Sequence, residues 1–114
     1  MKKTLYHATN PENVFSIIQN GFNPGADGYI YFCDTIDDSL IYSMIYHARK
    51  PHDVAVIPIE FDEDEIQGME INRDNDPRYT PTSYAYHGAI DKSRIPKLKD
   101  IPKMKIELKH NLRG

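Results

Sequence analysis

Apolar residues recur at helical spacing in two early segments of the chain. Four of them share one face of a first helix predicted between residues 10 and 21: Val14, Phe15, Ile17 and Ile18. Asn10 is a residue type that caps helix N-termini, and Pro11 suits the first helical position, where its missing N–H costs nothing. Gly21 follows the apolar face and predicts the end of this helix.

The second helical pattern lies in residues 34–50, DTIDDSLIYSMIYHARK. Its apolar positions again recur three and four residues apart: Leu40, Ile41, Met44 and Ile45. Asp34 and Thr35 each carry a side-chain oxygen that can cap the N-terminus of this helix, and the sequence does not choose between them.

The β-prone segments predict a sheet that surrounds these helices in the chain. β-branched and aromatic residues are enriched in five runs: 4–9, 29–33, 52–61, 84–90 and 104–108. The third run is the richest in Val and Ile, which predicts a buried central strand with Pro58 near an edge or irregularity. Residues 62–83 are acidic and then turn-rich, so we expect a long loop with short extended pieces. Because strict alternation of strand and helix ends after the second helix, we predict an α+β fold with a mostly antiparallel or split sheet.

Length, charge and cysteine content narrow the class of protein. The 114 residues suffice for one domain with one modest core, which we assign to residues 1–114. The net charge of −3 does not favour a nucleic-acid or membrane binder, and the basic C-terminal part is interrupted by acidic residues, as a solvated surface would be. No apolar run is long enough to span a bilayer, and the N-terminus lacks the apolar segment of a secretory signal.

The single cysteine bears on location and on metal binding. Cys33 has no partner for an internal disulfide, which suits a reducing cytoplasm, and we predict a cytoplasmic protein. No spacing of cysteine and histidine matches a structural zinc site, so we expect no metal. We expect Cys33 to be packed, on the strand face opposite Tyr31.

The first of two motif-like stretches is LYHATNPENVFSIIQNGFNPG, residues 5–25. It joins a short strand to a helix with a terminal glycine. His7 and Thr9 lie two apart on the strand, so both should point to one face of the sheet. Ala8 stands between them.

The second stretch is GYIYFCDTIDDSLIYS, residues 28–43. Tyr31 lies on the predicted strand, while Ser39 and Tyr42 are three apart and therefore on one face of the following helix. In this order and spacing, the two stretches resemble the ADP-ribosyltransferase superfamily, particularly its poly(ADP-ribose)-polymerase-like branch. The resemblance implies a split, mostly antiparallel sheet with two early helices, and NAD as the substrate.

The resemblance assigns the clamp for nicotinamide to the second stretch. Tyr31 and Tyr42 would sandwich the pyridinium ring, where cation–π attraction contributes on the order of 1–2 kcal/mol in a desolvated site. The hydroxyl of Ser39 would accept a hydrogen bond from the carboxamide. Ala8, where the family usually has glycine, still offers its backbone N–H and C=O to that amide.

The first stretch would position the rest of the dinucleotide. In the family, the residues that correspond to His7 and Thr9 hold the adenosine ribose, and His7 is also a catalytic candidate together with Tyr31. These roles follow from the resemblance. Taken singly, His7 is equally well explained as a structural histidine, and Tyr31 is better explained as a core residue of the second strand.

A third stretch, PTSYAYHGAI, residues 81–90, lies where the family has its catalytic glutamate before a strand. That position holds Ser83, which we name as a third catalytic candidate although it has no charge with which to stabilise an oxocarbenium-like ribose. The resemblance therefore argues against chain extension. Glu65 and Glu70, in the preceding segment, are alternative sources of a carboxylate.

Three functions remain open from the sequence. The first is a mono-ADP-ribosyltransferase that cleaves the nicotinamide–ribose bond of NAD and transfers ADP-ribose to an unidentified acceptor, a protein or a nucleic acid. The second is an inactive module that sequesters or senses NAD, ADP-ribose or a related nucleotide. The third is an RNA 2′-phosphotransferase-like activity, which would need clustered arginines, whereas the arginines here are dispersed: Arg49, Arg73, Arg78, Arg94 and Arg113.

Overall fold

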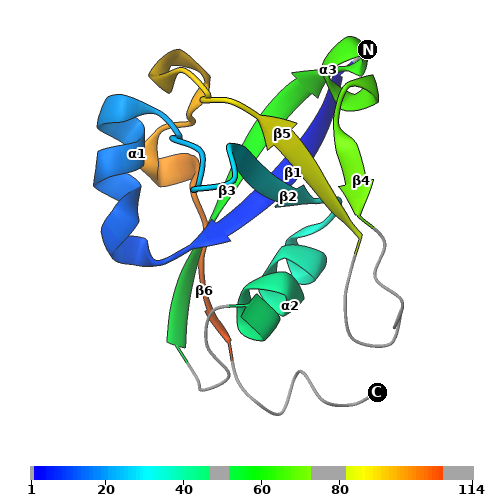
Figure 1. Cartoon of the computed structure of the whole chain (residues 1–114). Coiled ribbons are helices and arrows are strands. Elements are labelled where there is room, and N and C mark those ends of the chain that lie inside the picture. Colours follow the sequence, from blue (N-terminus) through cyan, green and yellow to red (C-terminus); the bar gives the residue numbers. More distant parts are fainter. Residues whose placement is uncertain (1, 47–51, 73–81, 107–114) are drawn as a thin grey trace.

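Among the residues that the structure describes, six antiparallel strands form one sheet in the order β4-β5-β2-β1-β3-β6. The computed structural model describes residues 2–46, 52–72 and 82–106 (Figure 1). The strands are β1 (Lys2–Thr9), β2 (Tyr29–Cys33), β3 (His52–Asp62), β4 (Glu70–Asn72), β5 (Ser83–His87) and β6 (Lys103–Ile106). The predicted α+β class is confirmed, as is the predicted mostly antiparallel sheet.

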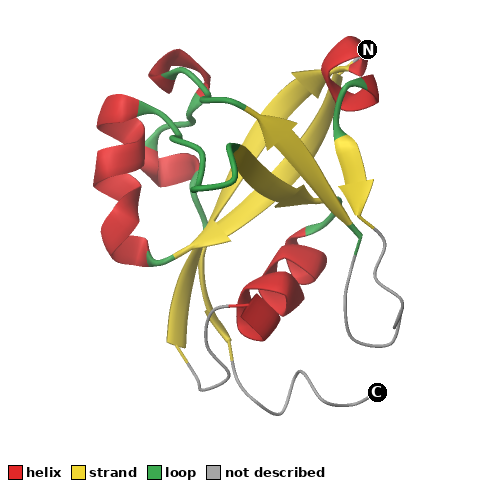
Figure 2. Cartoon of the chain, viewed as in Figure 1, coloured by secondary structure: helices red, strands yellow, loops and turns green. Residues whose placement is uncertain are grey.

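In the described part of the chain, three α-helices and three short 3₁₀ turns lie between the strands (Figure 2). They are η1 (Pro11–Asn13), α1 (Val14–Asn20), α2 (Ile36–Tyr46), α3 (Glu63–Gln67), η2 (Lys92–Arg94) and η3 (Leu98–Asp100). The helices α1 and α2 are the two predicted early helices. The C-terminal residues predicted for the second helix, 47–50, lie outside the described residues.

The sheet consists of two three-stranded halves that meet at one point. Strand β1 pairs with β3 along its whole length, from Lys2↔Asp62 to Thr9↔Ala55. Strand β2 pairs likewise with β5. Between the halves, β1 and β2 share the single register pair Tyr6↔Cys33. Beyond this pair the regular pairing of the two described strands ends, so one pair links the two halves of this single sheet.

The two faces of the β1–β3 half are covered by different helices. On one face, Leu5 and Ile57 are fully buried in the main core, against which residues of α1 pack. On the other face, Ala8 and Val56 are buried beneath Leu40 of α2. The alternation of side chains along a strand thus assigns odd positions of β1 to the α1 side and even positions to the α2 side.

The start of α1 differs from the sequence prediction in two respects. The side chain of Asn10 makes no capping hydrogen bond, and Pro11 begins a 3₁₀ turn that precedes the helix. Phe15, predicted on the apolar face, is 64% exposed, because the buried face of this short helix is defined by Val14 with Ile17 packed beside it.

Thr35, and not Asp34, caps α2. The Thr35 Oγ1 atom accepts a hydrogen bond from the backbone N–H of Asp38 at 3.0 Å, as an N-cap residue should. The carboxylate of Asp34 is used elsewhere: Oδ1 lies 2.9 Å from Lys3 Nζ, and Oδ2 accepts from the Tyr84 hydroxyl at 3.0 Å.

The acidic segment after β3 is helical at its start, so the prediction of a loop there was wrong. Asp62 and Glu65 form a capping box at the N-terminus of α3, in which each side chain accepts from the other's backbone N–H. The clustered carboxylates thus favour the helix start, where the dipole attracts negative charge. Strand β4 corresponds to one of the short extended pieces expected, whereas residues 73–81 lie outside the described residues.

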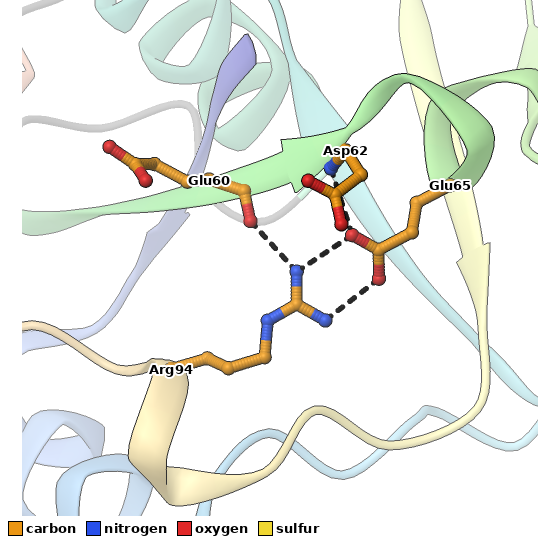
Figure 3. Close-up of polar contacts among 4 residues, drawn as sticks. All are labelled: Glu60, Asp62, Glu65 and Arg94. Atoms are coloured by element: carbon orange, nitrogen blue, oxygen red, sulfur yellow. Dashed lines mark hydrogen bonds and ion pairs between the residues drawn. The ribbon is translucent and has the colours of Figure 1, made fainter. Parts of the chain in front are cut away.

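The edge of β3 that faces away from β1 is paired with β6 over its first residues only. Arg94 contacts this edge further along the strand. Strand β6 pairs with β3 only up to Ala55. Further along, Arg94 donates from Nη2 to the carbonyl of Glu60 at 2.7 Å and holds the Glu65 carboxylate through Nη1 and Nη2, at 2.8 and 3.0 Å (Figure 3). Glu65 in turn accepts from the backbone N–H of Asp62 at 2.9 Å.

Candidate functional site

A small cavity lies between β1, β2 and α2, on the α2 side of the sheet where β1 and β2 diverge. Its volume of about 20 Å³ is room for roughly one water molecule. Seven residues line it: Tyr6, His7, Ala8, Tyr31, Cys33, Ser39 and Tyr42. Of the six predicted NAD-binding residues, the structure brings five together here and leaves out Thr9.

The rings of Tyr31 and Tyr42 face each other across this cavity. Their centroids are 6.3 Å apart and their planes differ by 25°. A third aromatic ring between them would need about 3.5 Å of separation on each side, close to 7 Å in total. The separation of 6.3 Å is smaller than this, and the cavity has room for roughly one water molecule, so a flat ring would enter between the two tyrosines only if they moved apart.

The backbone of Ala8 points into the gap between the two halves of the sheet. Ala8 is opposite Val56 in the β1–β3 ladder, and the Val56 N–H donates to the carbonyl of Pro102 at 2.9 Å, away from β1. In antiparallel pairing, Ala8 and Val56 are therefore a non-hydrogen-bonded pair. The N–H and C=O of Ala8 consequently point away from β3, towards β2, where the regular pairing has ended at Tyr6↔Cys33.

Ser39 contributes a buried hydroxyl that already donates a hydrogen bond within the protein. The side chain is 2% exposed, and its Oγ donates to the carbonyl of Ile36 at 2.7 Å. A hydroxyl that donates in this way keeps its lone pairs as acceptors. The role that the resemblance implies for this oxygen, accepting an N–H from a ligand amide, stays a prediction.

His7 has a different environment from the one that the resemblance implies. Its Nδ1 lies 2.7 Å from the carbonyl oxygen of Tyr31, and since a carbonyl can only accept, Nδ1 carries the proton. The imidazole packs edge-on against Phe22 and Phe32, at centroid distances of 4.9 and 5.7 Å. His7 thus links the two halves of the sheet beside the cavity, and in the structure it positions the Tyr31 backbone.

Thr9 does not share the cavity with His7. Its Oγ1 accepts from the side-chain amide of Asn13 at 3.1 Å, in the turn that leads to α1. The two residues are on one face of β1, as expected, but Thr9 lies at the end of the strand. A role for Thr9 in holding a ribose stays a prediction.

Ser83 lies next to the cavity wall but is not part of it. It is opposite Cys33 in the β2–β5 ladder and is 2% exposed. Of the two alternative carboxylates, Glu65 is bound to Arg94 and points to another part of the molecule. Glu70 lies on β4, opposite Ala85, and its Oε2 accepts from the Tyr29 hydroxyl at 3.0 Å.

Asp27, a carboxylate that no motif in the sequence singled out, contacts the clamp through Tyr31. The hydroxyl of Tyr31 donates to Asp27 Oδ2, and the other oxygen of Asp27 accepts from the Tyr29 N–H at 3.0 Å. The hydrogen bond to the carboxylate raises the pKa of Tyr31 to about 12 and lowers the pKa of Asp27. The sequence signal was available: an aspartate two residues before a strand, followed by Gly28 at φ +86°, is typical of a side-chain-capped turn.

Cys33 lines the cavity on the same strand face as Tyr31, so its predicted placement on the opposite face was wrong. Residues two apart on a strand share a face. Burial raises the pKa of the Cys33 thiol to about 12, which keeps it protonated and unreactive as a nucleophile.

A larger, open hollow of about 470 Å³ lies at the outer edge of β3, between Pro58 and the segment around Ile95. The guanidinium of Arg94 borders it, but Glu65 and the Glu60 carbonyl already occupy its donors. The other arginines, at positions 49, 73, 78 and 113, lie outside the described residues. We therefore place the candidate site at the smaller cavity, where polar backbone, hydroxyl and aromatic groups converge.

Comparisons with known proteins add no assignment. No model of a known protein family matches the chain, and no curated protein matches it.

Within residues 2–46, 52–72 and 82–106, no group of three or more His, Cys, Asp or Glu side chains is placed to hold a metal ion. In the same ranges, no helix has the length and apolar character needed to cross a membrane.

Proposed function

We propose that the protein binds NAD at the cavity between β1, β2 and α2 and transfers a single ADP-ribose unit to an acceptor. One observation supports the proposal. The near-parallel rings of Tyr31 and Tyr42 line the same cavity as Ser39, whose hydroxyl is buried, and Ala8, whose backbone N–H and C=O point away from β3. A flat ring that carries a carboxamide is the ligand whose shape and hydrogen-bonding groups match this set. The single buried thiol, Cys33, fits a reducing cytoplasm as the site of action.

The chemistry requires little from the protein beyond orientation and charge. When the bond between ribose C1′ and the nicotinamide nitrogen breaks, its electron pair goes to the ring nitrogen, and the pyridinium leaves as neutral nicotinamide without a general acid. The ribose becomes an oxocarbenium-like cation, which nearby negative charge stabilises. A nucleophile of the acceptor then forms the new bond to C1′ and loses its proton.

A binding module without turnover is the second candidate. Ser83 is buried, uncharged and outside the cavity wall, so the position that resembles the family's glutamate supplies no carboxylate. The carboxylates that approach the clamp, Asp27 and Glu70, bind the hydroxyls of Tyr31 and Tyr29. If they do not reach the ribose, NAD or ADP-ribose would be held without cleavage.

The test combines NAD binding by calorimetry with nicotinamide release by chromatography. Tyr42→Phe keeps the ring and should retain binding, whereas Tyr42→Ala removes one side of the clamp and should abolish it. Ser39→Ala should weaken binding several-fold, because about 1 kcal/mol of hydrogen bonding is lost, and Ser16→Ala, on the exposed surface of α1, is its matched control.

Each outcome separates the candidates. Binding with nicotinamide release that disappears in Tyr42→Ala supports the transferase. Binding without release supports the sequestering or sensing module. Absence of binding, or binding that is unchanged in Tyr42→Ala, would overturn both.

A further inference from the structure

Two tyrosine hydroxyls at the clamp each donate to a carboxylate. Tyr31 donates to Asp27, and its neighbour on the same strand face, Tyr29, donates to Glu70 at 3.0 Å. The rings of Tyr29 and Tyr31 are 6.4 Å apart, so the two pairs form one continuous surface. The clamp therefore has two aromatic rings and a carboxylate at the hydroxyl edge of one of them.

This arrangement changes what the Tyr31 ring attracts. The face of an aromatic ring is negative and binds cations. A phenol that donates its proton to a carboxylate becomes richer in electrons, and the carboxylate adds its own field, which falls off slowly over a few ångströms. Both effects favour a positive charge next to Tyr31, and neither favours a neutral ring.

We propose that Asp27, supported by Glu70, makes the Tyr31–Tyr42 clamp selective for a positively charged ring over a neutral ring of the same shape. This inference rests on the proposed function. It predicts that the pyridinium of NAD is bound and that the neutral dihydronicotinamide of the reduced dinucleotide is discriminated against. Asp27 and Glu70 act through the tyrosines and are specificity-determining residues in this scheme.

The selectivity has a consequence for turnover. The ring loses its positive charge in the step that breaks the bond to ribose, because the electron pair of that bond moves to the ring nitrogen. The attraction to the clamp therefore falls as the product forms, and neutral nicotinamide should leave readily. Free nicotinamide is accordingly expected to be a weak competitor of NAD.

The test uses ring fragments without phosphates, because the pyrophosphate of NAD would respond to the same carboxylates with the opposite sign. Binding of 1-methylnicotinamide, a cation, and of nicotinamide, its neutral counterpart, is measured by NMR titration at matched ionic strength. We expect the cation to bind about tenfold more tightly to the unaltered protein, a ratio typical of one cation–π contact reinforced by charge. The ratio should decrease as salt is added, because Asp27 is exposed.

Charge-neutralising variants identify the residues responsible. Asp27→Asn keeps an acceptor for Tyr31 and should lower the ratio of affinities several-fold, to the smaller preference that the aromatic rings alone give, and Glu70→Gln should lower it by less. Asp37→Asn is the matched control, since Asp37 is an exposed carboxylate in the first turn of α2 and its replacement changes the net charge equally. It should leave the ratio unchanged.

The results distinguish this inference from the proposed function. Equal affinity for the two rings, or a preference for the cation that is undiminished in Asp27→Asn, overturns the selectivity even if NAD binds and Tyr42→Ala abolishes that binding. Failure of both rings and of NAD to bind overturns the site itself. A preference for the cation that is reduced in Asp27→Asn and unchanged in Asp37→Asn supports the inference.

Discussion

Gly21 is a position where a single methyl group should have a large effect. The residue ends α1 with φ +80° and ψ −176°, a conformation that is essentially restricted to glycine. A Cβ atom there would lie 2.2 Å from the carbonyl oxygen of Ile90 and 2.9 Å from the backbone nitrogen of Lys92. Both are backbone atoms, so no side-chain rotation relieves the overlap.

The magnitude for Gly21→Ala follows from two contributions. The backbone conformation costs a residue with a Cβ about 1–2 kcal/mol. The overlap also separates Phe22 from Ile90, whose N–H and C=O exchange hydrogen bonds of 2.9 and 3.0 Å, each worth about 1 kcal/mol net. We therefore expect the free energy of unfolding to fall by about 3–4 kcal/mol, a large part of the stability of a small domain.

Urea denaturation followed by circular dichroism measures this loss against two matched variants. Gly88→Ala has the strained conformation, φ +99°, but no atom within 4 Å of its Cβ, so it should lose only about 1–2 kcal/mol. Gly25→Ala has neither strain nor close contact and should be nearly neutral. If Gly21→Ala is no less stable than Gly88→Ala, the close approach of the 21–22 and 90–92 segments is refuted.

Two further predictions concern the helix termini. Thr35→Ala removes the N-cap of α2 and should cost about 1 kcal/mol, whereas Thr35→Ser should keep the stability, as measured by urea midpoints. Arg94 lowers the pKa of Glu65, so this ion pair stabilises the fold above the unfolded-state pKa of about 4.3, and the contribution is lost as the pH falls through the lower folded-state pKa. The unaltered protein should therefore lose stability more steeply below pH ~4 than Arg94→Gln does, and parallel profiles would contradict the assignment.

The early part of the fold was predictable because local patterns determine it. The second helix has its apolar spacing and a threonine at the cap, and the first three strands are rich in β-branched and aromatic residues. The helix α3 was missed because clustered acidic residues suggest a solvated loop. The spacing of Asp62 and Glu65, three apart, is nevertheless that of a capping box and was visible in the sequence.

In the candidate site too, some contacts follow from local sequence and others depend on the pairing of distant strands. Tyr31, Ser39 and Tyr42 lie within one strand–turn–helix segment, so their convergence follows from local geometry. The contact of Tyr29 with Glu70 joins residues 41 apart and depends on the pairing of β2 and β4 with β5, which no local pattern specifies. Ser83 was expected just before a strand and is in fact the first residue of β5, and no local pattern specifies its burial beside Cys33.

The covered outer edge of β3 also bears on how the protein behaves at high concentration. An exposed strand edge is a template on which another chain can add its own strand and begin an aggregate. Here Pro58 has no N–H to offer, the carbonyl of Glu60 is taken by Arg94, and the N–H of Asp62 is taken by Glu65. The polar contacts of Figure 3 therefore act as a barrier to self-association, independently of anything that the opposite half of the sheet binds.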